Sequence, residues 1–329
     1  MRTPRLAVPG WLASVGDAAL EATVIGGFSR VGYVVRRRIF NWSTAPADLS
    51  GRFVVLTGAT SGIGREAALE MAAAGADLVL VGRDESRLAK VVADARKLGP
   101  VGASVHGLRL DLSLLSEARR LVTVVRELTP IVDVLVHNAG AMTHDYTVTQ
   151  EGFEVTFATQ VLSPFVITSG LLGELRAAGD PRVIVVASGG MYAERLDPDT
   201  VQSDPADYDG VRSYARAKRA QVALSEEWAR RFPEIDFHSM HPGWADTPGV
   251  ADALPGFRRI TGPILRTPAE GADTIVWLAA SSSRDTPSGR FWLDRRVRST
   301  VRLPWTRPVP GAAADLWHLV GVLTGEDPR

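Results

Sequence analysis

The chain has 329 residues, of which 45% are hydrophobic and 22% are charged, and lysine plus arginine equals aspartate plus glutamate at 37 each. This balance excludes the strong positive field of a nucleic-acid-binding protein, and the composition is too apolar for a disordered chain. The absence of cysteine excludes disulfides, thiolate nucleophiles, zinc fingers and iron–sulfur clusters, and the six histidines have no metal-ligand spacing. We therefore expect a cytoplasmic globular protein that binds a small molecule without a metal.

The first segment, residues 1–48, is predicted to be a helical extension. Its pattern is helical from Trp11 to Phe40 and ends in three consecutive arginines, Arg36 to Arg38, beside aromatic residues. No stretch reaches the roughly 18 to 20 apolar residues of a membrane span, and the acidic residues argue against a secretory signal. We favour an extension packed on the domain or on a second subunit, with peripheral contact with a membrane surface as the alternative.

After Pro46, short runs rich in valine, isoleucine and leucine alternate with helical segments, including a long predicted helix that ends at Ala178. Such strands are buried on both faces, so the pattern predicts an α/β fold with a doubly wound parallel sheet. We assign one domain to residues 49–300 and a C-terminal tail to residues 301–329. The predicted strands are Phe53–Leu56, Leu78–Val81, Val105–Leu110, Ile131–Val136, Val183–Ala187, Ile235–His238 and Arg290–Leu293.

A glycine-rich turn joins the first predicted strand to its helix. Closely spaced glycines let backbone N–H groups approach a phosphate, and the helix N-terminus adds a partial positive charge. The same pattern also occurs where a helix only packs closely against a strand, and the missing Gly-Lys-Ser/Thr excludes a nucleoside-triphosphatase loop. In a doubly wound sheet the turn predicts dinucleotide binding through Gly58, Thr60, Ser61, Gly62, Ile63 and Gly64.

The end of the second strand indicates the kind of dinucleotide. Gly82 and Arg83 occupy the place where a carboxylate would bind the ribose 2′-hydroxyl, and Asp84 comes one step later. Because a guanidinium group suits a 2′-phosphate, we predict NADP(H), with NAD(H) as the alternative cofactor. In the other interpretation Arg83 is a solvated residue and Asp84 is the N-cap of its helix.

Two further strand ends are candidates for cofactor contact. Asp111 and Leu112 follow the third strand, where an adenine would lie, and Asp111 can also cap the helix predicted from Ser113. Small residues let a backbone pass beneath a cofactor, and an amide side chain can brace neighbouring loops. The fourth strand ends in such residues: Asn138, Ala139 and Gly140.

Tyr214 and Lys218 lie one helical turn apart, so a phenol and an ammonium group share one helix face. A nearby cation favours the phenolate and lowers the pKa of a tyrosine toward the range of proton transfer at neutral pH. Ser188, after the fifth strand, can donate a hydrogen bond to a substrate carbonyl oxygen. Each residue alone is explained by a surface pair or a turn, but together behind a dinucleotide turn they indicate catalysis.

This ordered set of residues resembles the short-chain dehydrogenase/reductase family over roughly residues 50 to 300. The resemblance implies a Rossmann fold and an oxidoreductase in which Tyr214 is the proton donor, Lys218 also binds the nicotinamide ribose, and Ser188 positions the carbonyl. It implies homo-oligomers, either dimers or tetramers, and an adenine contact through Asp111. By the same resemblance the nicotinamide end of the cofactor is held by Pro242, Gly243 and Thr247.

The chain departs from the family pattern at two places. Ser188 and Tyr214 are 26 residues apart, more than in the shortest members, and the extra chain around Tyr192–Arg212 is predicted to form a flap near the substrate. Where many members have an asparagine that holds a water in a proton relay to the lysine, this chain has Gln160. The longer amide is expected to shift or slow the relay without changing the reaction type.

As a whole, the sequence predicts an NADP(H)-dependent oxidoreductase that moves a hydride between nicotinamide and a carbonyl or alcohol carbon. One rival is a dinucleotide-binding sensor or scaffold that has lost catalysis, which only Gln160 supports. The second rival, a nucleotide-binding methyltransferase, leaves the tyrosine–lysine pair unexplained. Apolar side chains after the sixth strand predict a hydrophobic substrate, or else a subunit or membrane contact; they are Trp244, Leu254, Phe257, Ile260 and Leu265.

Overall fold

One eight-stranded sheet forms the centre of the computed structural model, which describes residues 9–43, 46–140, 142–253 and 255–328. The strands run in the order β3-β2-β1-β4-β5-β6-β7-β8, and the neighbouring pairs are parallel except for β7–β8. In chain order they are β1 Phe53–Thr57, β2 Asp77–Gly82, β3 Val105–Arg109, β4 Val134–His137, β5 Arg182–Val186, β6 Asp236–Met240, β7 Arg290–Leu293 and β8 Arg296–Arg298.

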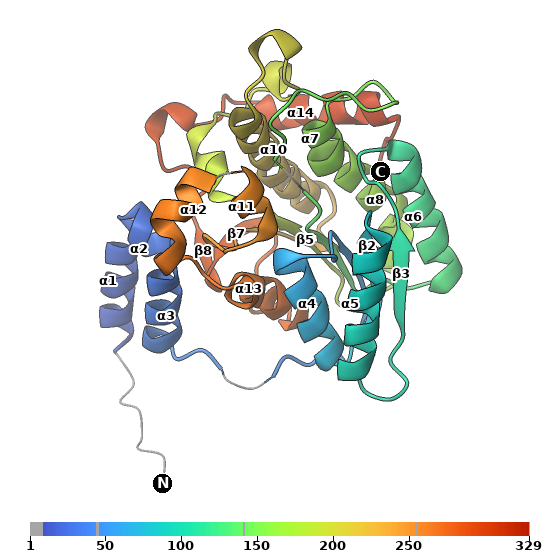
Figure 1. Ribbon diagram of the computed structural model, residues 1–329, viewed down its shortest axis with the longest axis horizontal. Coiled ribbons are helices and arrows are strands. Elements are labelled where there is room, and N and C mark those ends of the chain that lie inside the picture. Colours follow the sequence, from blue (N-terminus) through green and yellow to red (C-terminus); the bar gives the residue numbers. More distant parts are fainter. Residues whose placement is uncertain (1–8, 44–45, 141, 254, 329) are drawn as a thin grey trace.

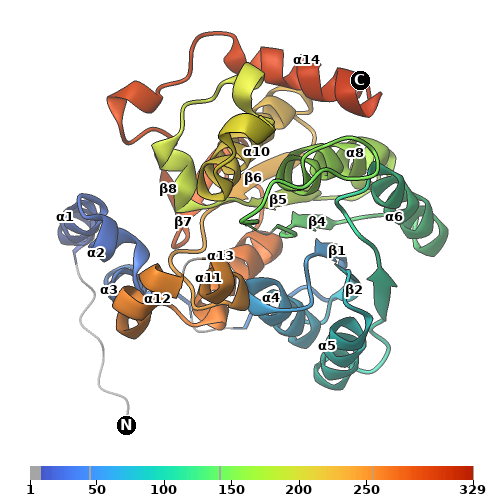
Figure 2. The same cartoon turned by 45° about the horizontal axis from the view of Figure 1, so that its top comes forward.

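Helices cover both faces of the sheet (Figure 1), and the turned view in Figure 2 separates the two layers. Every residue of β4 and β5 is buried, because their valines, leucine and isoleucine face a helix layer on either side. Each layer closes an apolar core against the sheet, and the predicted doubly wound α/β fold is confirmed. One layer contains α6 (Leu115–Leu128), α8 (Ser163–Gly170) and α10 (Gly210–Arg231), and the other α4 (Gly62–Ala73), α5 (Glu85–Leu98) and α13 (Pro268–Ala280).

The segment between β4 and β5 is less regular than the single long helix predicted to end at Ala178. After β4 the chain runs to Glu154, whose carboxylate accepts two backbone N–H bonds and caps the next helix. The prediction of a single long helix was wrong. A helical period in the sequence reveals neither a wider helical turn nor a break in the helix, and this segment has a break at Leu171. The segment consists of α7 (Val155–Phe157), a π-helical turn (Ala158–Leu162), α8 and α9 (Leu172–Arg176).

The sheet ends in a hairpin of β7 and β8. The predicted last strand has the bounds of β7, but β8 was missed because its three residues, Arg-Val-Arg, carry a single apolar side chain. Asp294 and Arg295 form the turn and both have a φ of +56°. A two-residue hairpin turn favours this left-handed backbone because it matches the twist of the strands.

The N-terminal residues form three helices instead of one, namely α1 (Gly10–Glu21), α2 (Val24–Phe28) and α3 (Arg30–Ile39). They lie together at the side of the molecule, near β8 and α12 (Pro255–Thr261) in Figure 1. Arg298 of β8 donates to both carboxylate oxygens of Asp17 at 2.8 Å, which joins α1 to the edge of the sheet. Among the described residues, no helix has both the length and the apolar character that crossing a membrane requires.

The residues assigned to a C-terminal tail include a helix, α14 (Ala312–Thr324), that packs against α10. The side chain of Trp317 is buried, and its ring centroid lies 4.6 Å from that of Trp228 and 5.0 Å from that of Phe165. The guanidinium of Arg231 lies 4.4 Å from the same ring centroid. These contacts make α14 part of the apolar core that α6, α8 and α10 share.

Replacing Trp317 by alanine is expected to lower the free energy of unfolding by about 3–5 kcal/mol, because removal of a large buried ring leaves a cavity. Urea unfolding followed by circular dichroism measures the change. Val322→Ala on the same helix is the matched control, since Val322 is 66% exposed, and we expect a change below about 0.5 kcal/mol. Equal losses in both variants would contradict the docking of α14.

Candidate active site

The predicted functional residues gather at the carboxyl ends of the central strands. In a parallel sheet these ends lie along one edge, and a crevice forms where the strand order reverses, which here is between β1 and β4. The glycine-rich turn follows β1, and Asn138 follows β4. Ser188 comes just after β5, and Pro242 comes just after β6. The fold therefore brings segments that are far apart in the sequence to one edge.

The glycine-rich turn has no room for a side chain at two of its glycines. A Cβ on Gly58 would lie 2.7 Å from the Cα of Ala139, and one on Gly64 would lie 2.2 Å from the carbonyl oxygen of Gly58. Gly58 and Gly62 have φ values of +68° and +53°, which glycine adopts without strain. Since α4 begins at Gly62, bare backbone and a helix N-terminus face the crevice, as dinucleotide phosphates require.

The other residues of the turn have different surroundings. Ser61 precedes α4 but makes no side-chain capping bond, and it is partly exposed. Ile63 packs toward α13, where a Cβ on Gly271 would lie 3.1 Å from its Cγ1. The side chain of Thr60 lies over Gly82, where a Cβ would be 2.2 Å from the Thr60 Cγ2. Ile63 therefore also has a packing role.

Asn138 ties the ends of β1 and β4 together. Its side-chain amide donates to the carbonyl oxygens of Thr57 and Gly58, each at 3.0 Å. The backbone N–H groups of Asn138 and Ala139 donate to the Thr57 hydroxyl at 3.0 and 3.1 Å. These four bonds fix the glycine-rich turn on the strand that carries Asn138, Ala139 and the exposed Gly140.

The turn after β6 approaches the same place. A Cβ on Gly62 would lie 3.2 Å from the Cβ of Thr247, so Thr247 contacts the start of α4. Pro242 and Gly243 are buried, and Gly243 has a φ of +79°. The structure thus brings Thr247 directly to the glycine-rich turn and holds Pro242 and Gly243 within the fold.

Lys218 connects α10 to the strand that carries Ser188. Its ammonium donates to the carbonyl of Val186 at 2.8 Å and to the side chain of Gln221 at 2.9 Å, and the residue is buried. The same nitrogen lies 5.4 Å from the ring centroid of Tyr214. A hydrogen bond links the side chains of Tyr214 and Ser188. Phenol, hydroxyl and ammonium therefore meet at the end of β5.

Burial changes the acidity of both titratable groups. Desolvation lowers the pKa of Lys218 to about 7, because an ammonium loses its hydration there. Burial raises the pKa of Tyr214, and the hydrogen bond with Ser188 opposes this only in part. The expectation that Lys218 lowers the pKa of Tyr214 is wrong for the protein alone, since such a lysine is only partly charged near neutral pH. Desolvation is the largest influence on the pKa of the Tyr214 phenol.

Gln160 lies in the π-helical turn and is fully buried. It contacts the residues after β4, because a Cβ on Gly140 would lie 3.1 Å from the Gln160 Cδ. A single wide turn of this kind changes the direction of the side chains within a helix and is frequent at functional sites. The sequence identified the residue but not the unusual helix that presents it.

Arg83 and Asp84 have separate surroundings after β2. Arg83 is exposed at the end of the strand. The carboxylate of Asp84 caps α5 by accepting the backbone N–H of Arg87 at 2.9 Å, and this hydrogen bond holds the pKa of Asp84 below its usual value. The predicted N-cap role of Asp84 is therefore observed. The side chain of the neighbouring Arg83 is exposed to solvent.

Asp111 does not cap α6 as one interpretation expected. It is exposed and accepts the backbone N–H of Ser113 at 3.0 Å, but α6 begins at Leu115. Glu151, which the sequence analysis missed, accepts the first N–H groups of α6 at 2.5 and 3.0 Å. Leu112 is buried, and its carbonyl accepts the hydroxyl of Ser163 at 2.7 Å. Leu112 therefore holds the strand end through its backbone.

Several residues that the sequence analysis did not single out lie in the loop after β4 or contact it. The hydroxyls of Thr143 and Tyr208 are 2.6 Å apart, and the rings of Tyr146 and Tyr208 meet edge to face at 5.4 Å. His144 Nε2 lies 3.3 Å from the carbonyl of Asp252 in α11 (Pro248–Ala253). Tyr208 belongs to the predicted flap, and the scarcity of tyrosine, five in the chain, was a usable signal.

The predicted apolar residues after β6 do not share one environment. The rings of Trp244 and Phe257 meet edge to face at 5.0 Å, and Leu265 is buried. Ile260 is 83% exposed, and Leu254 lies outside the described residues. Only part of this set can therefore form an apolar wall.

The comparisons with known proteins agree with this geometry. A family model described as short chain dehydrogenase matches residues 52–198. The chain is 39% identical over 293 residues to bovine dehydrogenase/reductase SDR family member 12, which covers 88% of this chain and 91% of that protein. It is 29% identical over 299 residues to mouse retinol dehydrogenase 14, with 85% and 88% covered.

The solved structure of the Pseudomonas aeruginosa RhlG/NADP active-site complex has the same fold. Its TM-score is 0.61 at 24% sequence identity, and the match covers 75% of this chain and 96% of that one. The similarity to the bovine relative extends well beyond residues 52–198 and confirms the resemblance that the motifs indicated. The chain therefore belongs to the short-chain dehydrogenase/reductase family and is an NAD(P)-dependent oxidoreductase.

Proposed function

We propose that the protein is an NADP(H)-dependent dehydrogenase/reductase that acts on the carbonyl or alcohol group of a hydrophobic small molecule. The observation that carries this proposal is the meeting of Ser188, Tyr214 and Lys218 at the end of β5. The bare backbone of the glycine-rich turn at the same edge of the sheet supports a dinucleotide there. A hydroxyl, a phenol and an amine beside a dinucleotide suit proton-coupled hydride chemistry.

In the direction of reduction, a bound NADPH would supply the hydride to the substrate carbon. The hydroxyl of Ser188 donates a hydrogen bond to the substrate oxygen and orients it. The phenol of Tyr214 donates its proton to that oxygen, which becomes the alcohol. Burial raises the pKa of Tyr214 and so holds the phenol in the protonated form that this step needs.

Lys218 holds α10 against β5 through the hydrogen bonds that its side-chain nitrogen donates to Val186 and Gln221. Two of its three donors are used by Val186 and Gln221. The third is proposed to bind the nicotinamide ribose, and Gln160 to support the proton relay. The rest of the proposed cofactor site consists of Gly58, Thr60, Ser61, Gly62, Ile63, Gly64, Arg83, Asp111, Leu112, Asn138, Ala139, Gly140, Pro242, Gly243 and Thr247.

A hydrophobic substrate is supported by the chain around the mouth of the site. Tyr146 and Tyr208 pack against each other beside the loop after β4, and Trp244 packs against Phe257. One relative is named retinol dehydrogenase, and retinol is an apolar alcohol. The alternative, a dinucleotide-binding sensor without catalysis, has only Gln160 in its favour.

Tyr214→Phe is expected to reduce the turnover of NADPH with aldehydes or ketones by at least about 1,000-fold, because it removes only the proton donor. Binding of NADPH, measured by fluorescence titration, is expected to change by less than about twofold. A Tyr146→Phe variant is the control and should keep most of its activity. Unchanged turnover in Tyr214→Phe, or binding without turnover in the unaltered protein, would refute the assignment.

Arg83→Ala is expected to raise the KM for NADPH by about 10- to 100-fold, because a charge-assisted hydrogen bond to the 2′-phosphate contributes about 1.5–3 kcal/mol. The KM for NADH should stay nearly constant, since NADH has no 2′-phosphate. Arg87→Ala is the matched control, because Arg87 is also an exposed arginine but pairs with Asp84 at 3.3 Å. Equal effects on both cofactors would overturn the preference for NADP(H).

We further propose that the protein is a cytoplasmic homo-oligomer that contacts a membrane surface through its N-terminal helices. Large apolar side chains are exposed on α1, α2 and α3, where a globular surface would ordinarily be polar. Two arginines of α3, Arg37 and Arg38, are exposed as well and suit anionic lipid headgroups. The exposed apolar residues are Trp11, Leu12, Val15, Val24, Ile25 and Val31.

The double variant Trp11→Ser, Ile25→Ser is expected to reduce co-sedimentation with vesicles of phosphatidylcholine and phosphatidylserine by at least about tenfold, since it removes apolar area from the contact. Val101→Ser, at another fully exposed position, is the control and should bind as the unaltered protein does. Light scattering of both proteins measures the oligomer. Unchanged vesicle binding, or a loss of oligomer without any vesicle binding, would contradict the membrane contact.

A further inference from the structure

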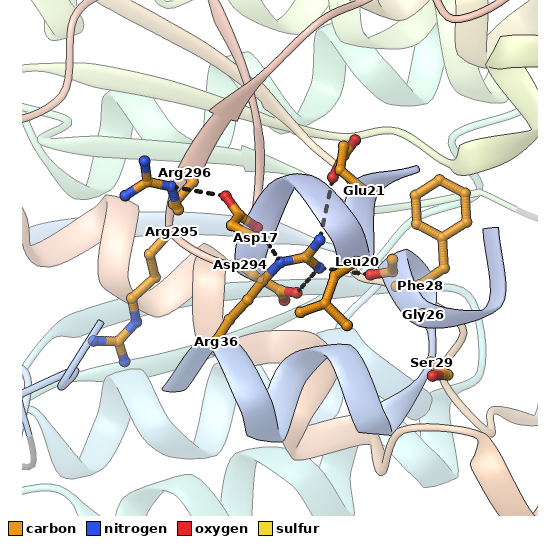
Figure 3. A network of polar contacts seen from close by, with 12 residues as sticks. Asp17, Leu20, Glu21, Gly26, Phe28, Ser29, Arg36, Asp294, Arg295 and Arg296 are labelled. Carbon is orange, nitrogen blue, oxygen red and sulfur yellow. Dashed lines mark hydrogen bonds and ion pairs between the residues drawn. The ribbon is translucent and has the colours of Figure 1, made fainter. Parts of the chain in front are cut away.

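Arg36 of α3 lies at the centre of a buried cluster of charges between the N-terminal helices and the β7–β8 turn (Figure 3). Its side chain has no exposed surface, and its guanidinium donates to Asp17 and to Asp294, each at 2.7 Å. It also donates to the carbonyl of Gly27 at 2.6 Å. The orientation of this group is fixed, because a shift would leave a buried charge without a partner.

Asp294 extends this constraint to a second buried arginine. Both of its oxygens accept hydrogen bonds from Arg266, at 2.5 and 2.9 Å, and both side chains are almost completely buried. Arg266 also donates to the carbonyl of Pro242 at 3.2 Å and to the carbonyl of Phe28 at 3.0 Å. One guanidinium therefore binds the end of α2 and the turn after β6 at the same time.

The turn after β6 is in close contact with this guanidinium. A Cβ on Gly243 would lie 2.2 Å from the Nε of Arg266, so the backbone passes directly over the side chain. The backbone N–H of Trp244 donates to the carbonyl of Phe28 at 2.8 Å, and the carbonyl of Trp244 accepts the N–H of Arg266 at 2.7 Å. Residues 242–244 are thus held by α2 on one side and by Arg266 on the other.

The ring of Phe28 makes a second connection to the site. It is buried and meets the ring of His241 edge to face, with centroids 4.6 Å apart. His241 in turn supports the residue after Ser188, because a Cβ on Gly189 would lie 2.9 Å from the His241 Nε2. Phe28 therefore contacts the site both through its carbonyl and through its ring.

We propose that α2 and α3 position the nicotinamide and substrate side of the active site. Arg36 acts on Pro242 and Gly243 through Asp294 and Arg266, while Phe28 acts on Ser188 through His241. This inference rests on the proposed function, which places Ser188 and the 242–243 turn beside substrate and nicotinamide. Phe28, Arg36, Arg266 and Asp294 are positioning residues, and a displacement of about 1 Å at a reacting centre can reduce the rate by about 100-fold.

The test compares Arg36→Met and Phe28→Leu with Arg182→Met in the full-length protein. Arg182 is a matched control because it is equally buried and donates to the carbonyl of Leu278 at 2.9 Å, but it lies at the opposite, amino end of β5. All three variants are expected to lower the Tm. Only Arg36→Met and Phe28→Leu should raise the KM for NADPH or lower kcat, by about 10-fold or more, at a temperature where every variant is folded.

Amide hydrogen exchange supplies a readout that does not depend on catalysis. The two variants are expected to speed exchange in residues 242–246, including the Trp244 N–H that Phe28 holds, whereas Arg182→Met should leave it unchanged. Wild-type exchange and kinetics in folded Arg36→Met and Phe28→Leu would overturn the inference, and so would equal changes in Arg182→Met. If Arg36→Met does not fold, Phe28→Leu decides the question, because it buries no unpaired charge.

The kinetic and exchange results also separate this inference from the proposed function. If the unaltered protein oxidises no NADPH with any carbonyl compound, the proposed function fails, and a positioning role in that reaction fails with it. Faster exchange at 242–246 in both variants would then show that the helices hold the turn for another purpose. Faster exchange with normal kinetics in an active enzyme would contradict the positioning role alone.

Discussion

The close approach of two backbones at the ends of β1 and β4 is the constraint on which the site depends. Gly58 lies against Ala139 with no space for a Cβ, and the amide of Asn138 binds the carbonyls on either side of the turn. These contacts leave backbone N–H groups at the N-terminus of α4 free of side chains, which is what a phosphate needs. Thr247 lies against the first residue of α4 in the same arrangement.

Desolvation is the second influence on the site. Lys218 is buried where its ammonium has two protein acceptors and no water shell, so its pKa falls to about 7. Tyr214 is affected in the opposite direction, and the neutral phenol is favoured. Proximity of a cation and a phenol in the sequence says nothing about burial, which is why the sign of the tyrosine pKa shift was predicted incorrectly.

The sequence predicted well what depends on local pattern, and less well what depends on tertiary contacts. Most of the parallel strands are buried and have nearly continuous apolar runs, so β1 to β7 were predicted, although β3 at the edge of the sheet is only partly buried. The π-helical turn at Gln160 and the Glu151 carboxylate at α6 were missed, because each depends on partners distant in the chain or on helix geometry. The same holds for Arg36 and Arg266, whose role appears only when three separate segments meet at Asp294.

The hairpin that ends the sheet also affects how molecules meet one another. β8 is only three residues long, and both of its arginines, Arg296 and Arg298, form ion pairs with Asp17 of α1. A short, charged strand beside a helix offers little unpaired backbone to a strand of another molecule. Because of these ion pairs with α1, the edge strand β8 is a poor template for an intermolecular β-sheet. The folded chain is thereby protected from aggregating along this edge.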